Sequence, residues 1–73
     1  MRLRKTTIKN VVFHNSYILK NGYKIIVEQK NNSRIRKGDI IIQCEPISPI
    51  PDGKYSIKGK LFKKINVMDG RII

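Results

Sequence analysis

Two short clusters of cationic side chains carry the clearest chemical signal in this sequence. One lies near the start of the chain, and the other follows a polar run, KNNS, that is typical of a solvated loop. Arginine suits phosphate because its planar guanidinium group donates two parallel hydrogen bonds. We therefore expect both clusters to contact phosphate. The clusters are Arg2, Arg4 and Lys5, and Arg34, Arg36 and Lys37; a third basic group, Lys58, Lys60, Lys63 and Lys64, surrounds Gly59.

The central cluster has two possible explanations. Gly38 and Asp39 suit a turn into a strand, but a turn does not require three cations beside it. The cations could simply keep the loop soluble and protect an edge strand. The overall charge favours anion binding instead, because the 73 residues hold 16 Lys and Arg against 5 Asp and Glu, a formal net charge of +11. Such an excess repels itself in a compact state, and a polyanion relieves that repulsion.

Nucleic acid is the commonest polyanion, so we expect a DNA or RNA partner. Contacts to phosphate would supply most of the affinity and little sequence preference. The charge leaves a second possibility open, in which the basic surface docks on an acidic protein. The chain would then be a phage-encoded structural protein, such as a minor virion component, or an inhibitor, and an oligomer is possible. We expect a cytoplasmic or virion-associated protein with no membrane partner, since no apolar run approaches the roughly 18 residues of a membrane span.

Two tyrosines flank the Asn-Gly pair of the stretch YILKNGYKIIVEQ, with lysines between them. In barrels that bind single strands, bases stack on exposed aromatic rings while a basic groove follows the backbone. An ordinary amphipathic hairpin has the same pattern, so core packing is an equal alternative for both rings. The residues that would take part in binding here are Tyr17, Lys20, Tyr23 and Lys24.

The sequence offers little for catalysis or for metal binding. His14 and Cys44 are each the only residue of their kind, which is too few for a familiar zinc site. We interpret His14 as an ordinary strand residue and Cys44 as a small buried apolar group. Three of the five acidic residues, at positions 39, 52 and 69, stand next to a glycine, where turn chemistry explains them. We therefore expect no enzymatic activity, no cofactor and no metal.

The elements that position these residues are expected to be strands. Alanine is absent, and isoleucine and valine, which lose rotamer freedom in helices and pack well on pleated sheets, are abundant. No segment shows convincing helical periodicity. We predict an all-β fold of five or six short strands in a small antiparallel barrel of the OB or SH3-like type, or in a twisted sheet. Residues 1–7 are expected to form a basic arm, and residues 8–73 a single small β domain.

Three local predictions follow from the turn signals. Asn21-Gly22 predicts a two-residue type I′ turn that places Ile18 opposite Ile25 and Tyr17 opposite Ile26. The stretch EPISPIPDG is too rich in proline for a central strand, and we expect an extended crossing there. The final three residues, 71–73, are expected to add a short strand to an edge of the sheet, where they could pair with a neighbouring molecule.

Two passages resemble known proteins. NGYKIIVEQ followed by RIRKGDIII resembles the strand-loop-strand passage of bacterial OB-fold proteins such as the translation initiation factor of that fold, although the proline-rich crossing departs from that family's pattern. The tail DGKYSIKGKLFKKINVMDGRII looks like the C-terminal hairpin of short proteins from AT-rich bacterial and phage genomes. The second resemblance implies a phage source, and neither assigns a functional residue.

Overall fold

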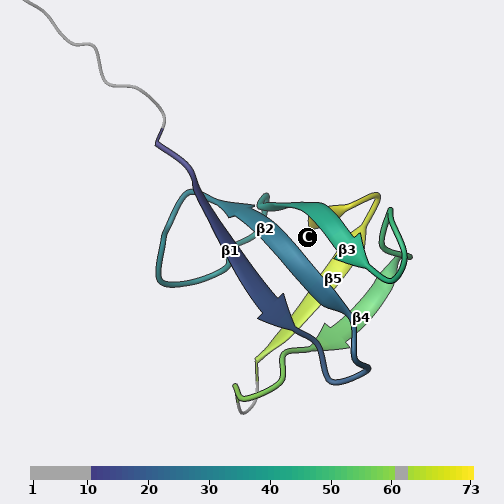
Figure 1. Cartoon of the computed structure of the whole chain (residues 1–73). Helices are drawn as coiled ribbons and strands as arrows, with labels where there is room; N and C mark the ends of the chain where they lie inside the picture. The colour runs from purple at the N-terminus through teal and green to yellow at the C-terminus, as the bar shows by residue number, and fades with distance from the viewer. Residues whose placement is uncertain (1–10, 61–62) are drawn as a thin grey trace, which may run out of the picture.

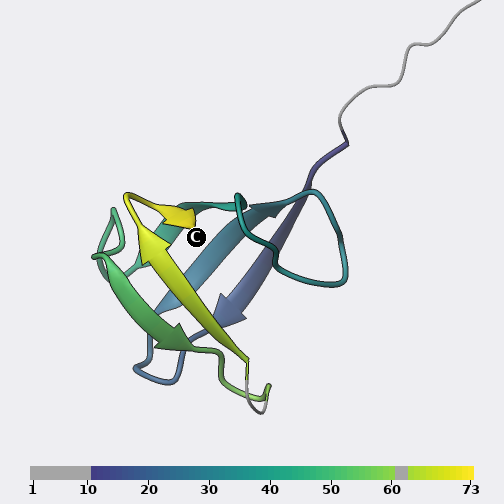
Figure 2. The ribbon, with the colours of Figure 1, turned by 180° about the vertical axis from the view of Figure 1, so that it is seen from behind.

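Six antiparallel strands form the fold of residues 11–60 and 63–73, the part of the chain that the computed structural model describes. Their order in the sheet is β1-β2-β3-β6-β5-β4. The sheet curls, so that β4 and β5 lie across from β1 and β2 (Figures 1 and 2). This half-barrel confirms the predicted all-β antiparallel fold. The strands are β1 (Phe13–Ile18), β2 (Lys24–Gln29), β3 (Ile40–Glu45), β4 (Gly53–Ser56), β5 (Lys64–Met68) and β6 (Arg71–Ile72).

The turn between β1 and β2 has three residues rather than the predicted two. The Leu19 carbonyl accepts a hydrogen bond from the Gly22 N–H at 2.9 Å, and the Leu19 N–H donates to the Tyr23 carbonyl at 2.7 Å. Gly22 has a φ of 97°, whereas Asn21 does not have the positive φ that a type I′ turn requires. A three-residue hairpin loop that ends on a left-handed glycine explains this geometry.

This longer turn shifts the register of the hairpin by one residue. Tyr17 pairs with Ile25, and Ser16 pairs with Ile26. The predicted pairs of Ile18 with Ile25 and of Tyr17 with Ile26 were therefore wrong. Because side chains alternate between the faces of a sheet, pairing Tyr17 with the fully buried Ile25 places the tyrosine on the core face. Ile18 points to the outer face and is exposed.

A bulge in β3 increases the curl of the sheet. Ile26 and Val27 are neighbours in β2, but the register shifts between them and leaves Ile42 of β3 as an extra, exposed residue. A bulge bends its strand and increases the local twist. It also lets Ile41 and Cys44, three positions apart, both face the core.

The two edge strands meet at one end of the sheet. Leu19, just after β1, forms an isolated antiparallel bridge with Ile57, just after β4, and both side chains are buried. This bridge closes the half-barrel at that end. Two backbone hydrogen bonds of 2.8 Å flank it, from Lys20 N–H to the Ser56 carbonyl and from Lys58 N–H to the Ile18 carbonyl.

Strand β6 lies inside the sheet, between β3 and β5, and not at an edge as predicted. Asp69 and Gly70 have φ values of 55° and 75°, so both central positions of this turn are left-handed. This turn is therefore of type I′, and it pairs Met68 with Arg71. After this turn, β6 pairs with β3 on one side and with β5 on the other. The free edge that was predicted at residues 71–73 is therefore absent from the described sheet.

The proline-rich segment between β3 and β4 is a series of bends, not the predicted extended crossing. Its Ile50 side chain is buried and belongs to the core. Cys44 is also buried, which confirms its prediction as a small core residue. Among the described residues, no helix is long and apolar enough to cross a membrane. The core consists of Leu19, Ile25, Val27, Ile35, Ile41, Cys44, Ile50, Ile57, Ile65, Val67 and Ile72.

Candidate functional site

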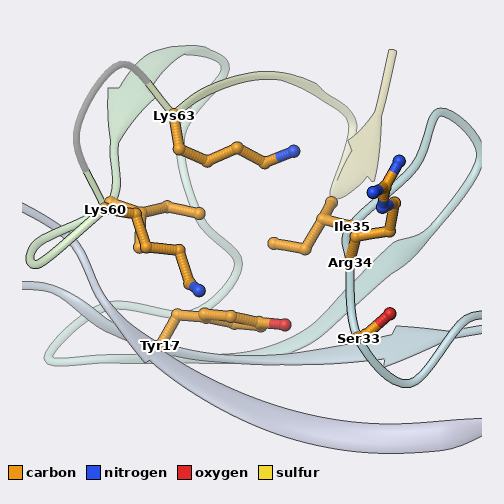
Figure 3. A pocket seen from close by; sticks show the side chains of 7 residues that line it. Tyr17, Ser33, Arg34, Ile35, Lys60 and Lys63 are labelled. Carbon is orange, nitrogen blue, oxygen red and sulfur yellow. The ribbon is translucent and has the colours of Figure 1, made fainter.

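A pocket of about 280 Å³ lies beside β1. It is next to the bridge between Leu19 and Ile57, on the side where the half-barrel stays open. Side chains from three separate segments surround it (Figure 3). They come from β1, from the β2–β3 loop (residues 30–39) and from the connection between β4 and β5. The lining residues are Tyr17, Ser33, Arg34, Ile35, Ile57, Lys60 and Lys63.

The pocket is strongly cationic. Arg34, Lys60 and Lys63 line it, and no acidic side chain is among its described lining residues. Figure 3 shows the two lysines on one side and Arg34 on the other, with the amino group of Lys63 extending inward. Positive charges held together in a concave site focus the electrostatic field and raise the local concentration of anions. This arrangement can bind an anion of matching size.

A buried glutamine fixes the tyrosine at the pocket wall. The Tyr17 hydroxyl donates a 2.7 Å hydrogen bond to Oε1 of Gln29. Nε2 of Gln29 donates in turn to the Asn31 carbonyl at 2.9 Å. Because Gln29 is 0% exposed, it has no alternative partners in bulk water. The Tyr17 ring is therefore held in one orientation along the pocket (Figure 3).

The first half of the β2–β3 loop is ordered by Asn31. Its Oδ1 accepts hydrogen bonds from the backbone N–H of Ser33 and from the Ser33 hydroxyl, both at 2.8 Å. An asparagine that bonds the backbone two residues further on forms an Asx turn, which suits a tight change of direction after a strand. The Gln29 bond to the same residue joins this turn to the pocket wall.

The second half of the loop is anchored by Ile35 and Asp39. The Ile35 side chain belongs to the core, and Asp39 is 4% exposed. Oδ2 of Asp39 accepts a 2.8 Å hydrogen bond from the Arg36 N–H, which confirms the predicted turn role of this acid. Arg34 lies directly before the anchored Ile35, so its backbone is positioned although its side chain is exposed.

Of the predicted binding residues that the structure describes, two, Tyr17 and Arg34, line this pocket. Arg36 and Lys37 are exposed on the same loop but do not line it. Their position is compatible with contacts to a ligand that extends beyond the pocket. The predicted arm at residues 1–7 lies outside the described residues. The same holds for the predicted cations of the N-terminal cluster, which are Arg2, Arg4 and Lys5.

The hairpin residues are distributed over other surfaces. Lys20 is exposed in the turn. Tyr23 is partly buried against the core and faces the Tyr55 ring, with 6.1 Å between the ring centroids. Lys24 lies on the outer face of β2, in a second pocket of about 150 Å³ that Glu45 also lines. The predicted interleaving of two tyrosines with two lysines is thus not one surface, since the rings point inward and Lys24 points outward.

Sequence reasoning missed Lys60, Lys63 and Gln29 as parts of the site. The lysines carried a signal, because they belong to the basic group around Gly59. Nothing local indicated that this group would face Tyr17, since barrel closure between Leu19 and Ile57 creates that proximity. Gln29 carried no signal, because a glutamine at the end of an apolar strand normally indicates a surface position.

Other chemistry is sparse in the part of the chain that the structure describes. No group of three His, Cys, Asp or Glu side chains there could hold a metal ion. His14 lies in β1, and its Nε2 is 3.3 Å from Oε1 of Glu28 on the exposed face. Comparisons with protein-family models, with curated proteins and with solved structures find no match to this chain. The pocket itself is therefore the basis for a function.

Proposed function

We propose that this protein is a non-catalytic nucleic-acid-binding module that binds single strands with little sequence preference. The observation that carries the proposal is the cationic pocket, which Arg34, Lys60 and Lys63 line together with Tyr17. Single-strand-binding proteins combine a basic groove for the backbone with aromatic rings for the bases. An unpaired base can enter such a pocket, whereas a base within a duplex is stacked and paired.

The division of labour follows from the chemistry of each side chain. The guanidinium of Arg34 and the two ammonium groups contact phosphate oxygens. The Tyr17 ring stacks on a base, and it tolerates any sequence because every base has a π face. Arg36 and Lys37, exposed beyond the pocket on the same loop, extend the contact to neighbouring phosphates. Affinity then depends mainly on counterion release from the strand.

Fluorescence anisotropy over a salt series tests this proposal. The ligands are a labelled single-stranded oligonucleotide and its duplex. We expect tighter binding of the single strand and a linear fall of log K with log salt. Each lost phosphate contact, as in Arg34→Gln, should reduce the magnitude of that slope by about 0.7.

Lys54→Gln is the matched control for charge, because Lys54 is exposed on β4 and does not line the pocket. It should change the slope less than Arg34→Gln does. Equal effects of the two substitutions would show that the pocket is not the binding site. Absence of binding at low salt would overturn the proposal and leave an acidic protein as the partner to search for.

A further inference from the structure

The pocket beside β1 ends on the hydrophobic core. Two of its lining residues, Ile35 and Ile57, are 6% and 2% exposed and are members of the core. Ile57 is also paired with Leu19 in the bridge that closes the half-barrel. A polymer cannot continue through this packed interior. It can only insert one end into the pocket or lie across its mouth.

The charge in the pocket suits the end of a strand better than its middle. A phosphate at a strand end is a monoester, which carries about −1.5 to −2 charges at pH 7 and has three free oxygens. An internal phosphodiester carries a single charge and has two free oxygens. Arg34, Lys60 and Lys63 supply three cationic groups from two loops on opposite sides of one small cavity (Figure 3). Three cations can contact the three free oxygens of the monoester, and its higher charge is attracted to them more strongly than the single charge of a diester.

The remaining polar and aromatic groups fit the rest of a terminal nucleotide. The Tyr17 ring lies along the wall next to Lys60 (Figure 3). Its hydroxyl hydrogen is used in the bond to Gln29, so the ring face, rather than a donated hydrogen bond, is what it presents to a ligand. A flat base or a sugar can pack there while the phosphate lies among the cations.

From these features we infer that the pocket binds the phosphorylated terminal nucleotide of a single strand. This inference rests on the proposed function, and it names the part of the nucleic acid that the site recognises. The phosphomonoester lies between Arg34, Lys60 and Lys63, and the base or sugar of the same nucleotide lies against Tyr17. The rest of the strand leaves through the mouth toward Arg36 and Lys37.

Three oligonucleotides of identical sequence test the inference by anisotropy at one fixed salt concentration. One carries a 5′-phosphate, one a 3′-phosphate, and one has hydroxyl groups at both ends. The fluorophore is attached to an internal base so that both ends stay free. We expect one phosphorylated strand to bind about tenfold more tightly than the unmodified strand, which is the effect of one additional charge-assisted hydrogen bond. The preferred strand identifies the end that enters the pocket.

Two substitutions at Lys63 test whether the preference for a phosphorylated end arises in this pocket. Lys63→Gln should abolish the preference for the phosphorylated end, and Lys63→Arg should retain it. Lys54→Gln changes the net charge equally at an exposed site outside the pocket and should leave the preference unchanged. Thermal melting of each variant shows whether it is folded before its binding is compared.

The outcomes separate this inference from the function on which it rests. Binding with equal affinity to all three strands overturns end recognition and leaves single-strand binding in place. A preference that survives Lys63→Gln overturns the assignment to this pocket. Absence of binding to all three strands overturns both.

Discussion

The hydroxyl of Tyr17 on β1 donates a 2.7 Å hydrogen bond to Oε1 of Gln29, the last residue of β2, whose side chain is fully buried. The two residues are twelve positions apart, and only the register of the hairpin brings them to the same face of the sheet. The bond connects the wall of the cationic pocket to the core. It also connects that wall to the β2–β3 loop, because Gln29 donates to the Asn31 carbonyl.

Tyr17→Phe should destabilise the fold. The substitution removes the donor and leaves the buried Oε1 of Gln29 without a partner, which costs about 1–3 kcal/mol. Urea unfolding followed by circular dichroism measures the change in the free energy of unfolding. The double variant Tyr17→Phe/Gln29→Leu should lose less than the sum of the two single losses, since no unpaired Oε1 remains, although the Gln29 bond to the Asn31 carbonyl is lost as well. Additive losses in the double variant would show that the bond contributes little.

Two substitutions of Tyr17 distinguish the contribution of its ring to binding from the contribution of its hydroxyl. Tyr17→Phe keeps an aromatic face in the pocket, and Tyr17→Leu removes it while keeping an apolar side chain there. We expect Tyr17→Leu to weaken single-strand binding by about 1–3 kcal/mol, the contribution of one stacked base. Tyr17→Phe should bind nearly as well as the wild type, measured at a temperature where both variants are folded. Equal binding by all three proteins would remove stacking from the proposed mode.

Gly22→Ala tests the three-residue turn. A Cβ at this position meets no atom within 4 Å, so any cost comes from the backbone conformation, where φ is 97°. A left-handed conformation costs about 1–2 kcal/mol for an ordinary L-residue, and asparagine tolerates it better. We therefore expect a clear loss of stability for Gly22→Ala and a smaller one for Gly22→Asn in urea unfolding. Unchanged stability of the alanine variant would contradict the turn described here.

Asp39 is expected to stabilise the loop that holds Arg34. Asp39→Ala removes the acceptor of the Arg36 N–H and should cost about 1–3 kcal/mol, since the position is buried. Asp39→Asn retains a side-chain oxygen and should cost less. Hydrogen exchange of the Arg36 amide provides a local readout, and its protection should fall in the alanine variant. A loss of global stability without faster exchange at Arg36 would argue against this role.

Stability should fall at alkaline pH, partly because of Cys44. Burial raises the pKa of the Cys44 thiol above the ordinary value of 9.0, and burial likewise raises the pKa of Tyr55 above 10.0. As pH rises past 9.0, the unfolded chain loses its thiol proton while the folded chain retains it, so unfolding becomes more favourable. The stabilising contribution of the protonated Cys44 thiol is intact below pH 9.0 and is lost as pH rises through its folded-state pKa.

Cys44→Ala isolates the thiol from the other groups that titrate in alkali. The free energy of unfolding, measured from neutral pH to above 9.0, should decline less steeply in this variant than in the wild type. The variant will also be less stable at neutral pH because the side chain is part of the core. Parallel pH curves for the two proteins would mean that the thiol does not contribute.

Local signals in the chain were sufficient for the class of fold. The abundance of β-branched residues, the absence of helical periodicity and the Gly-containing turns predicted five or six antiparallel strands, and the described part of the chain forms six. Local signals did not predict the register of the first hairpin, which depends on whether its turn has two residues or three. Asn21-Gly22 suits a two-residue turn by type alone, but Leu19 and Ile57 must both be buried where the barrel closes, and the observed register achieves this. A slip of one residue exchanges the two faces of a strand.

The sequence by itself determined that this protein is basic, rich in strands and supplied with cationic loops. Arg34 and Tyr17 could be selected from it because a charged loop residue and an aromatic strand residue are each recognisable in isolation. Only the tertiary structure decided that Lys60 and Lys63 join them, since those side chains come from a loop at the opposite edge of the sheet. Composition is a property of single residues, whereas a pocket depends on the curl and closure of the whole sheet, which are set by packing among residues distant in the chain.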